Sequence, residues 1–329
     1  MPKLENITNM AELQRLLDEQ SSGESRTIII EEMTAALNER VKGQEHVTED
    51  LARFIKLQWA KQKRKRPIAN LLFLGPTGTG KTEMAKALAE YLYKDEKNMV
   101  RIDCSELTGP ESKTRLTGAS AGYVGFGQGG QLTRPLLTNP KRVVLFDEIE
   151  KAYTEVLDLF LQIMGDGRLT EQSSGEVADF TQSIIILTSN LEAEAVGRLQ
   201  EEMADPNERT NAVKTQLVAS GKFRPEIAGR IDKVYVFKPL KGIVIAEIVA
   251  QKMAGLAKEY GLELVYVDHR LIFEAMKRGN KLAKFGIREL DREIGNMLGD
   301  HMIAAKEAGG KRVRLDIEDD GVMAISPAD

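Results

Sequence analysis

The sequence predicts an α/β protein in which a parallel five-stranded sheet is covered by helices and is followed by a smaller, mostly helical domain. Short continuous apolar runs alternate with amphipathic helical segments from Val41 onward, as in a parallel sheet buried on both faces. A glycine-rich segment, GPTGTGKT, lies directly between one of these apolar runs and a helical segment. The alternation ends after Pro239, which places a domain boundary near residue 240.

The expected strands are apolar runs of four residues, each separated from the next by a helical segment. Because both faces of such a strand are covered, its apolar residues are continuous rather than alternating. In chain order the runs are LLFL (71–74), MVRI (99–102), VVLF (143–146), IIIL (184–187) and VYVF (234–237). Beyond the boundary, Arg312–Ile317 and Val322–Ile325 are expected to form a small hairpin around a DDG turn.

Residues 1–40 are expected to form a helical arm that packs or docks and carries no chemistry. Three leucines share one face of a helix over residues 10–20, SSGES (21–25) is a linker, and a second helical run extends from Thr27 to Arg40. The expected division is therefore an arm (1–40), an α/β domain (41–240) and a C-terminal domain (241–329).

The composition is that of an ordinary globular protein with two or three domains. The chain has 329 residues and a net charge of −4, so no global basic face favours nucleic acid as a partner. A single cysteine, Cys104, excludes an internal disulfide, and three histidines with one thiol cannot build the usual zinc site. Without an apolar run of membrane-spanning length or a signal-peptide core, we expect a cytoplasmic protein with no membrane insertion.

The glycine-rich segment has the pattern of a phosphate-binding loop, GxxxxGK[ST], with the required strand before it and helix after it. Glycines let the backbone N–H groups point at phosphate oxygens, at the positive end of the following helix. Lys81 would reach the β- and γ-phosphates of a nucleotide, and the Thr82 hydroxyl would bind Mg²⁺. The alternative is a plain glycine-rich turn. The expected nucleotide-binding residues of the loop are Gly75, Pro76, Thr77, Gly78, Thr79, Gly80, Lys81 and Thr82.

An acidic pair follows the apolar run VVLF and supplies the carboxylates that hydrolysis of a bound nucleotide needs. Asp147 would complete the Mg²⁺ site, and Glu148 would polarise a water for in-line attack on the γ-phosphate. Asn190 ends the next buried run and would contact that water or the γ-phosphate through a neutral amide. Acidic pairs also cap helices and asparagine also forms turns, so each residue has an ordinary structural alternative.

These elements and their order resemble the AAA+ ATPases, most closely the second ATPase module of the Clp chaperones, of the ClpB disaggregase kind. The resemblance covers about residues 27–329 and implies an AAA+ P-loop NTPase fold, ATPase activity, and ATP and Mg²⁺ as cofactors. Its further motifs are VKGQ (41–44), GASAGYVGFGQGG (118–130), EKA (150–152), GDGRLT (165–170), KFRPEIAGRID (222–232) and KFGIREL (284–290).

The resemblance also implies roles for residues outside the phosphate loop. Val41 and Gly43 would hold adenine through the backbone. Arg230 would reach the ATP of a neighbouring subunit, and Arg288 would contact the nucleotide from the C-terminal domain. For either arginine alone, a surface salt bridge would be the better explanation. The chain reads GRID and GIRE where the family usually has Asn-Arg and GARP, and neither change removes the charged group.

The implied function is that of an unfoldase or remodelling chaperone, a homo-hexameric ring that threads a polypeptide substrate through its centre. Tyr123 and Val124 would lie on the pore loop that grips the substrate, although Tyr123 could instead pack on its own domain. Because one ATPase module is matched, we expect a single-ring form. The charge of Arg198, in the sequence Val196-Gly197-Arg198, argues against a protease partner, whose docking loop needs an apolar anchor there.

Other functions follow from other features of the chain. A short N-terminal arm suits an ATP-driven assembly switch or scaffold for a specific partner, and Tyr123→Ala would separate this from threading. A DNA motor would use KQKRKRP (61–67), but this cluster is explained by the end of a helix. GASAG (118–122) matches a nucleophile elbow, yet Ser120 lies in a glycine-rich loop instead of a strand-to-helix turn.

Overall fold

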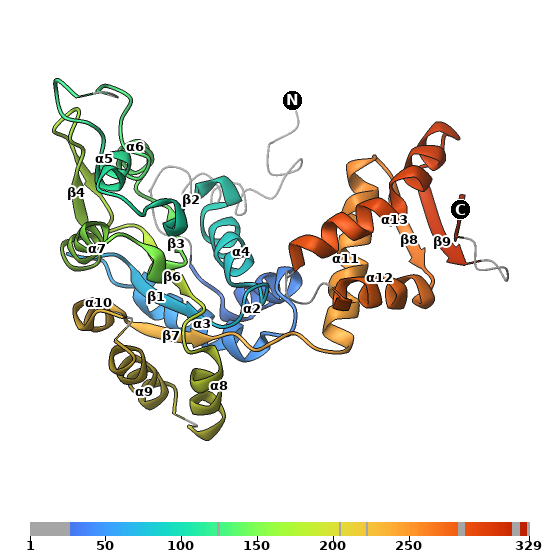
Figure 1. The fold of residues 1–329 in the computed structure, drawn as a ribbon, viewed down its shortest axis with the longest axis horizontal. Helices are drawn as coiled ribbons and strands as arrows, with labels where there is room; N and C mark the ends of the chain where they lie inside the picture. The colour runs from blue at the N-terminus through green and yellow to red at the C-terminus, as the bar shows by residue number, and fades with distance from the viewer. Residues whose placement is uncertain are drawn as a thin grey trace, which may run out of the picture.

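A computed structural model describes residues 27–123, 126–203, 205–221, 223–281, 287–317 and 323–327. The helix expected over residues 10–20 and the linker at 21–25 lie outside the described residues. Two bodies lie side by side along the longest axis in Figure 1, with the α/β part on the left and the last helices and strands on the right.

Five parallel strands form the central sheet, in the order β2-β3-β6-β1-β7, which confirms the predicted parallel five-stranded sheet. Each predicted apolar run overlaps one strand, and the strands extend one or two residues further, because backbone pairing continues past the apolar core. The last predicted run, 234–237, extends one residue beyond its strand: Phe237 lies outside the strand, although its N–H still donates to Leu74 O. The strands are β1 (Ala69–Leu74), β2 (Met99–Asp103), β3 (Val143–Asp147), β6 (Ile184–Ser189) and β7 (Lys233–Val236).

Helices cover both faces of the sheet, and alternate residues of β1 point to different cores. Leu71 and Phe73 belong to one buried cluster, which includes residues of α2, α3 and α4. Leu72 and Leu74 belong to the other, which includes residues of α7, α9 and α10. The helices and short 3-10 turns of this part are α2 (Ile30–Arg40), α3 (Glu45–Trp59), α4 (Lys81–Tyr93), η2 (Glu96–Asn98), η3 (Cys104–Glu106), α5 (Glu111–Thr117), α6 (Thr133–Thr138), η4 (Ile149–Lys151), α7 (Thr154–Asp166), α8 (Ala193–Glu202), α9 (Pro206–Ala219) and α10 (Pro225–Arg230).

Local signals explain where several of these helices begin and end. The Asp205 carboxylate accepts hydrogen bonds from the N–H groups of Asn207 and Glu208, and proline follows it, so α9 begins there. Gly167 takes a left-handed conformation (φ 63°) and ends α7. The helical run expected from Thr27 begins at Ile30 instead, because the preceding residue, Ile29, has extended backbone.

A short antiparallel hairpin, β4 (Arg168–Thr170) and β5 (Val177–Asp179), follows α7 and was not among the predicted strands. Each of its strands has three residues, of which only the central one is buried. A single buried side chain per strand leaves no apolar run to find in the sequence. The hairpin lies beside α5 and α6 at one end of the molecule (Figure 1).

The C-terminal elements have a buried cluster of their own, built around Val249, Met253, Leu298 and Leu315. A three-stranded sheet, β10-β9-β8, contains the predicted hairpin, although β8 was not predicted and Val322 lies outside the described residues. This separate core supports the proposed division near residue 240. The elements are α11 (Ile243–Glu259), β8 (Glu263–Val267), α12 (His269–Lys281), α13 (Ile287–Glu307), β9 (Arg312–Ile317) and β10 (Met323–Pro327). Among the described helices, none has both the length and the apolar composition needed to cross a membrane.

Candidate nucleotide-binding site

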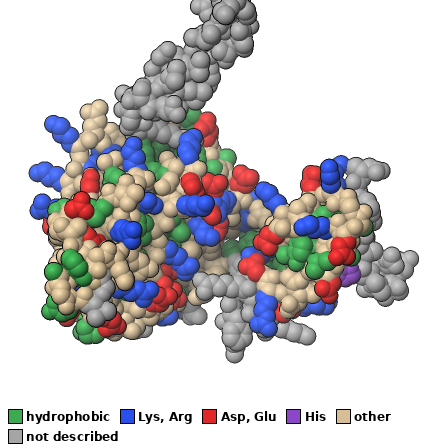
Figure 2. Space-filling view, turned by 90° about the horizontal axis from the view of Figure 1, so that it is seen from above, with side chains coloured by type: hydrophobic (Ala, Val, Ile, Leu, Met, Phe, Trp, Pro, Cys, Tyr) green, Lys and Arg blue, Asp and Glu red, His purple; other side chains and the backbone are tan. Residues whose placement is uncertain are grey.

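A cavity of about 830 Å³ lies between the carboxyl ends of the sheet strands and the C-terminal helices. In open α/β sheets, ligands bind at this edge of the strands. Side chains of both charges gather beside the junction of the two bodies (Figure 2). The predicted site residues that line the cavity are Val41, Thr77, Gly78, Thr79, Gly80, Lys81, Thr82, Asp147, Glu148 and Asn190.

The phosphate loop wraps tightly because its glycines adopt conformations that other residues avoid. Gly75, Gly78 and Gly80 have φ values of 143°, 79° and 96°. A Cβ on Gly75 would lie 2.5 Å from Phe237 O, so a larger residue would displace backbone. Gly75 and Pro76 form the floor of the loop beneath Lys81 and do not line the cavity.

Lys81 is the first residue of α4, and its ammonium group folds back over the loop. Its Nζ donates hydrogen bonds to Gly75 O at 2.6 Å and to Pro76 O at 2.8 Å. Burial lowers the pKa of Lys81 from its usual value, and the nearby carboxylates, Asp147 foremost, oppose that shift. The lysine is thus placed at the base of the cavity, where a phosphate would supply a closer counter-charge.

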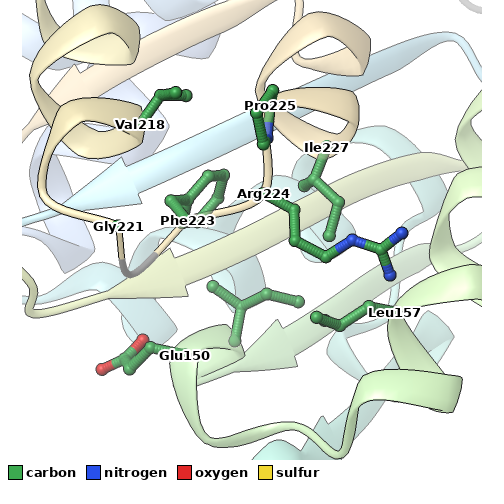
Figure 3. Close-up of a pocket in the computed structure, with 9 residues that line it drawn as sticks. Glu150, Leu157, Val218, Gly221, Phe223, Arg224, Pro225 and Ile227 are labelled. Atoms are coloured by element: carbon green, nitrogen blue, oxygen red, sulfur yellow. The ribbon is translucent and has the colours of Figure 1, made fainter.

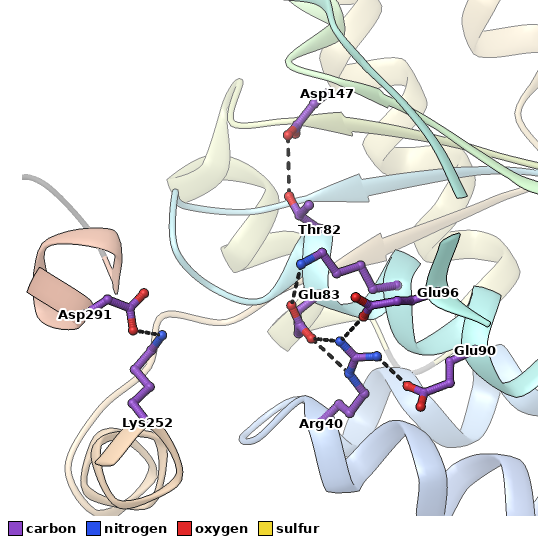
Figure 4. A network of polar contacts seen from close by, with 9 residues as sticks. Arg40, Thr82, Glu83, Glu90, Glu96, Asp147, Lys252 and Asp291 are labelled. Atoms are coloured by element: carbon purple, nitrogen blue, oxygen red, sulfur yellow. Dashed lines mark hydrogen bonds and ion pairs between the residues drawn. The ribbon is translucent and has the colours of Figure 1, made fainter. Parts of the chain in front are cut away.

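Asp147 and Thr82 meet at the other side of the loop, as Figure 4 shows. The Thr82 hydroxyl lies 3.4 Å from Asp147 Oδ2, and Arg101 pairs with the same carboxylate oxygen at 2.6 Å. Thr188 donates a hydrogen bond to the other oxygen, Oδ1. A hydroxyl and a carboxylate are the hard oxygen donors that Mg²⁺ takes, so these residues fit a magnesium ion bound together with a nucleotide.

Glu148 has a left-handed backbone conformation (φ 55°, ψ 53°), which is uncommon for a residue with a side chain. Its N–H donates to the Thr188 hydroxyl at 3.0 Å, and its carboxylate pairs with Lys151. Thr188 therefore holds both acidic residues, one through a carboxylate and one through the backbone. Thr188 was not predicted from the sequence. It could have been found, because it lies near the end of a buried strand, two residues before Asn190.

The segment expected to hold adenine lies beside the phosphate loop. Gly43 needs a left-handed backbone (φ 73°), and a Cβ there would meet Val244 at 2.7 Å. Gln44 is fully buried and was not predicted. Its amide donates to Thr79 O at 3.3 Å and to Lys238 O at 2.9 Å, and it accepts from Lys238 N at 3.0 Å. One side chain thus joins the phosphate loop to the segment that leads into α11.

Two ion-pair groups on the cavity walls also escaped the sequence analysis (Figure 4). Arg40 pairs with Glu83, Glu90 and Glu96, which ties the end of α2 to α4. Burial opposes its charge, but the hydrogen bonds to these carboxylates hold the pKa of Arg40 above its usual value. Across the cavity, a lysine–aspartate pair joins α11 to α13, formed by Lys252 and Asp291.

The structure does not bring Arg230 to this cavity. Arg230 ends α10, is exposed, and packs its guanidinium on Gly165, where a Cβ would lie 1.7 Å from Nη1. Its backbone is held by the buried Asn70, whose amide donates to Arg230 O at 3.1 Å and to Met164 O at 3.0 Å. Arg288 belongs to α13, and its side chain lies outside the described residues.

The loop between α5 and α6, which includes Tyr123, extends at the far end of the α/β part from the C-terminal helices (Figure 1). Tyr123 is 73 % exposed, so most of its ring faces solvent, and Phe126 is 52 % exposed. Val124 lies outside the described residues. The glycine-rich loop thus exposes two aromatic side chains that do not line the cavity.

A second cavity, of about 240 Å³, lies between η4, α7 and α10 (Figure 3). Apolar side chains line most of it, and the two charged residues of its lining are Glu150 and Arg224. Arg224 pairs with Asp158 at 2.8 Å, outside this cavity. The lining includes the start of α10 at Pro225, but this helix has only six residues and its first residue, a proline, has no N–H to offer a phosphate.

The basic segment 61–67 is partly engaged with the protein itself. Arg64 donates to the backbone oxygen of Trp59, and Arg66 pairs with Asp232 at 2.8 Å. These contacts use two of its five cationic side chains. They agree with the view of this segment as a helix end.

Residues 66–234 match the family model described as AAA domain (Cdc48 subfamily). Similar curated proteins include the chaperone protein ClpB of Bacteroides thetaiotaomicron, 38 % identical over 299 residues, which are 87 % of this chain and 34 % of that protein. ClpB of Corynebacterium efficiens is 43 % identical over 269 residues, 79 % of this chain and 30 % of that protein. ClpB of Streptomyces albus G is 38 % identical over 309 residues, 92 % of this chain and 35 % of that protein. The chain thus spans about a third of the length of the curated relatives it matches.

Proposed function

The chain belongs to the AAA domain family (Cdc48 subfamily) and is a Clp-type AAA+ ATPase, and from this premise we propose that it unfolds or remodels polypeptides in an ATP-dependent manner. The observation that carries the proposal is the composition of the large cavity. The phosphate loop, the acidic pair and two C-terminal helices all line it. A nucleotide bound there would contact both bodies of the chain.

In the proposed reaction, the phosphate loop holds the nucleotide, with Lys81 at the β- and γ-phosphates. Thr82 and Asp147 would hold Mg²⁺, which offsets the charge of the phosphates when bound. Glu148 accepts the proton of the attacking water, and Asn190 orients that water or the γ-phosphate. Lys151 neutralises Glu148 in this structure, so the base must exchange this partner for a water before it acts.

The proposed assembly is a homo-hexamer, in which Arg230 acts on the nucleotide of a neighbouring subunit and Arg288 on that of its own. The exposure of Arg230 and its distance from the cavity of its own chain support a role across a subunit boundary. A guanidinium offers rigid bidentate donors to phosphate, so charge supplied by the next subunit would couple hydrolysis to assembly.

The proposed substrate is a polypeptide, gripped in the central pore by Tyr123, with Val124 beside it. The exposure of Tyr123 and Phe126 supports this role, because aromatic rings offer apolar area to any extended peptide. No protease or nucleic-acid partner is proposed, and the proposed compartment is the cytoplasm. The second candidate is an assembly switch for a specific partner, which the same exposed loop would serve as a docking element.

Solution mass measured by light scattering on Glu148→Gln tests the assembly. This variant should bind Mg²⁺-ATP but hydrolyse it at least about 100-fold more slowly, because the general base is lost. We expect a mass of about six protomers with Mg²⁺-ATP. A monomer or an open-ended filament under these conditions would contradict the ring and would favour the switch.

Tyr123→Ala separates threading from switching. We expect the rate of polypeptide remodelling to fall at least about tenfold. ATP turnover without polypeptide should change less than twofold, because Tyr123 lies outside the nucleotide cavity. Tyr123→Phe is the matched control and should keep most of the activity, since it keeps the ring. Equal remodelling by the alanine variant would contradict threading.

A further inference from the structure

Glu171 is a buried carboxylate that the nucleotide chemistry does not use. It follows β4 and is 2 % exposed. Within the residues that the structure describes, no lysine, arginine or histidine forms an ion pair with it. A buried carboxylate without a cation must be held by hydrogen-bond donors, because desolvation disfavours its charge.

The donors around Glu171 come from two separate segments. Oε2 accepts from the N–H of Gly130 at 2.9 Å and from the hydroxyl of Thr133. Oε1 accepts from the hydroxyl of Ser173 at 2.8 Å and from its N–H at 3.3 Å. Burial raises the pKa of Glu171, and the hydrogen bonds lower it. The hydrogen bonds outweigh burial and hold the pKa of Glu171 below its usual value.

Both ends of the 118–130 loop meet at this carboxylate. Gly130 donates to it directly, and a Cβ on Gly118 would lie 1.8 Å from Oε1, so only glycine fits there. Next to these contacts, Gln172 N donates to Thr117 O at 2.7 Å. The Glu171 side chain therefore attaches the base of the loop to the β4–β5 hairpin, and backbone bonds from Gln131 N to Arg115 O and from Leu132 N to Leu116 O close the base beside it.

The middle of the same loop forms a turn of its own, in which Tyr123 N donates to Ser120 O and Phe126 N donates to Tyr123 O, both at 3.2 Å. A Cβ added to Gly122 or to Gly127 would meet nothing within 4 Å, and Tyr123 stands between them, 73 % exposed. Local backbone bonds therefore shape the turn that carries Tyr123, and the contacts at the base of the loop set where this turn lies on the domain. Figure 1 shows α5, α6 and β4 together at this end of the molecule.

A continuous path of chain connects this base to the acidic pair. Glu148 is followed directly by η4, α7 and β4, and Glu171 is the next residue after β4. The helix α7 packs most of its apolar side chains into the core of the sheet, which holds it firmly against the strands. A shift at Glu148 would reach Glu171 through one helix and one short strand.

We propose that Glu171 is a positioning residue, which fixes the base of the 118–130 loop to the β4–β5 hairpin and so places Tyr123 for contact with a polypeptide. The inference rests on the proposed function in one respect, which is that Tyr123 contacts a polypeptide. The anchoring itself is a property of the isolated chain and can be measured there.

Glu171→Gln tests the anchor in the full chain. The amide keeps the size of the side chain but replaces one acceptor oxygen with an N–H group, which faces the donors of the loop. We expect hydrogen exchange at the Gly130 amide to rise about tenfold or more, because an amide that loses its acceptor also loses protection. Unchanged exchange at Gly130 would overturn the proposal.

The functional arm compares ATP turnover with remodelling. Glu171→Gln should lower polypeptide remodelling at least about fivefold and change ATP turnover without polypeptide by less than twofold, because the loop lies outside the cavity. Glu176→Gln is the matched control, on an exposed residue of the same hairpin, and should alter neither exchange nor remodelling. Wild-type remodelling by Glu171→Gln, where Tyr123→Ala is defective, would also overturn the proposal.

The two possible failures are distinguishable. If Tyr123→Ala itself remodels normally, the proposed threading fails, and exchange at Gly130 still decides the anchor. If Glu171→Gln does not fold, Thr133→Val removes one donor from the carboxylate and keeps the shape of the buried side chain. A smaller rise in Gly130 exchange, about threefold, is then expected, and no rise would contradict the anchor.

Discussion

Two glycine-rich loops of the same α/β part, Gly75–Thr82 and Gly118–Gly130, differ in what their glycines are for. In the phosphate loop, a Cβ on Gly75 or Gly80 would lie within 3.0 Å of a neighbouring atom, and the loop closes around Lys81. In the second loop, Gly122 and Gly127 stand in open space. Glycine serves close packing in the first loop, and in the middle of the second loop it serves freedom of the backbone.

This difference explains why the two loops suit different ligands. A phosphate has fixed geometry, and preorganised N–H groups bind it without the cost of ordering the loop. An extended polypeptide varies along its length, so an exposed ring on a turn whose glycines lie in open space, above a fixed base, is better suited to follow it. The base of the second loop is as crowded as the phosphate loop, since Gly118 and Gly130 admit no side chain.

The largest expected effect is on ATP turnover, which should depend on the charged side chain of the first loop and not on the aromatic side chain of the second. Lys81→Ala should lower ATP turnover at least about 100-fold, because the charge next to the β- and γ-phosphates is lost. The measurement is steady-state phosphate release at saturating Mg²⁺-ATP, with Tyr123→Ala as the comparison variant. ATP turnover by Lys81→Ala close to that of the wild type would break the assignment of the phosphate site.

The second prediction compares glycines directly. Gly75→Ala should lower the free energy of unfolding by about 2–4 kcal/mol, because Phe237 O must move away from the new methyl group. Gly122→Ala should cost about 1 kcal/mol, the price of a left-handed conformation without a steric contact. Urea unfolding of both variants decides it, and equal losses would mean that the two loops are packed alike.

Sequence reasoning succeeded where one residue type carries the signal. Continuous apolar runs located all five strands of the main sheet. Residues 78–82, Asp147 and Glu148 line one cavity, and their roles toward a nucleotide stay predictions. Sequence reasoning missed β4, β5 and β8, which are short and have few buried residues. An isolated buried residue in a short segment has no period to detect.

Polar partners were missed for a different reason. Arg101 and Thr188 reach Asp147 from two other strands, and Gln44 reaches Lys238 across 194 residues of sequence. Such contacts depend on which strands are neighbours in the sheet, and strand order cannot be obtained from apolar runs. The same holds for Glu171, whose importance is visible only once the 118–130 loop is seen to close on it.

A third prediction tests how much the phosphate loop depends on its hydrogen bond to the Gln44 side chain. Gln44→Ala leaves Thr79 O and the backbone of Lys238 without buried partners, so the free energy of unfolding should fall by about 1–3 kcal/mol. The KM for ATP should rise severalfold in the same variant, because the loop loses its support. Thermal unfolding and steady-state kinetics are the measurements, and an unchanged KM would show that the loop holds itself.

The smallest expected effect is a pH-dependent change in folding stability that arises from Glu171, at the base of the second loop. Because hydrogen bonds hold the pKa of Glu171 below its usual 4.5, its ionised form stabilises the folded state above that pH. This contribution is lost as pH falls through the lowered pKa of the folded state. The stability difference between wild type and Glu171→Gln should therefore stay constant between about pH 7 and pH 5 and shrink in more acidic solution. A difference that grows with acid would show that Glu171 is neutral when folded.

The left-handed backbone of Glu148 has a consequence for how this chain can change over time. Glycine would relieve the conformational cost at this position, of roughly 1 kcal/mol, and random substitution toward a more stable fold would therefore favour it. Glycine has no carboxylate, so under the proposed mechanism the more stable chain would lose its general base. If Glu148 has that role, keeping it means accepting a less stable protein, and selection for thermostability alone should lose it first.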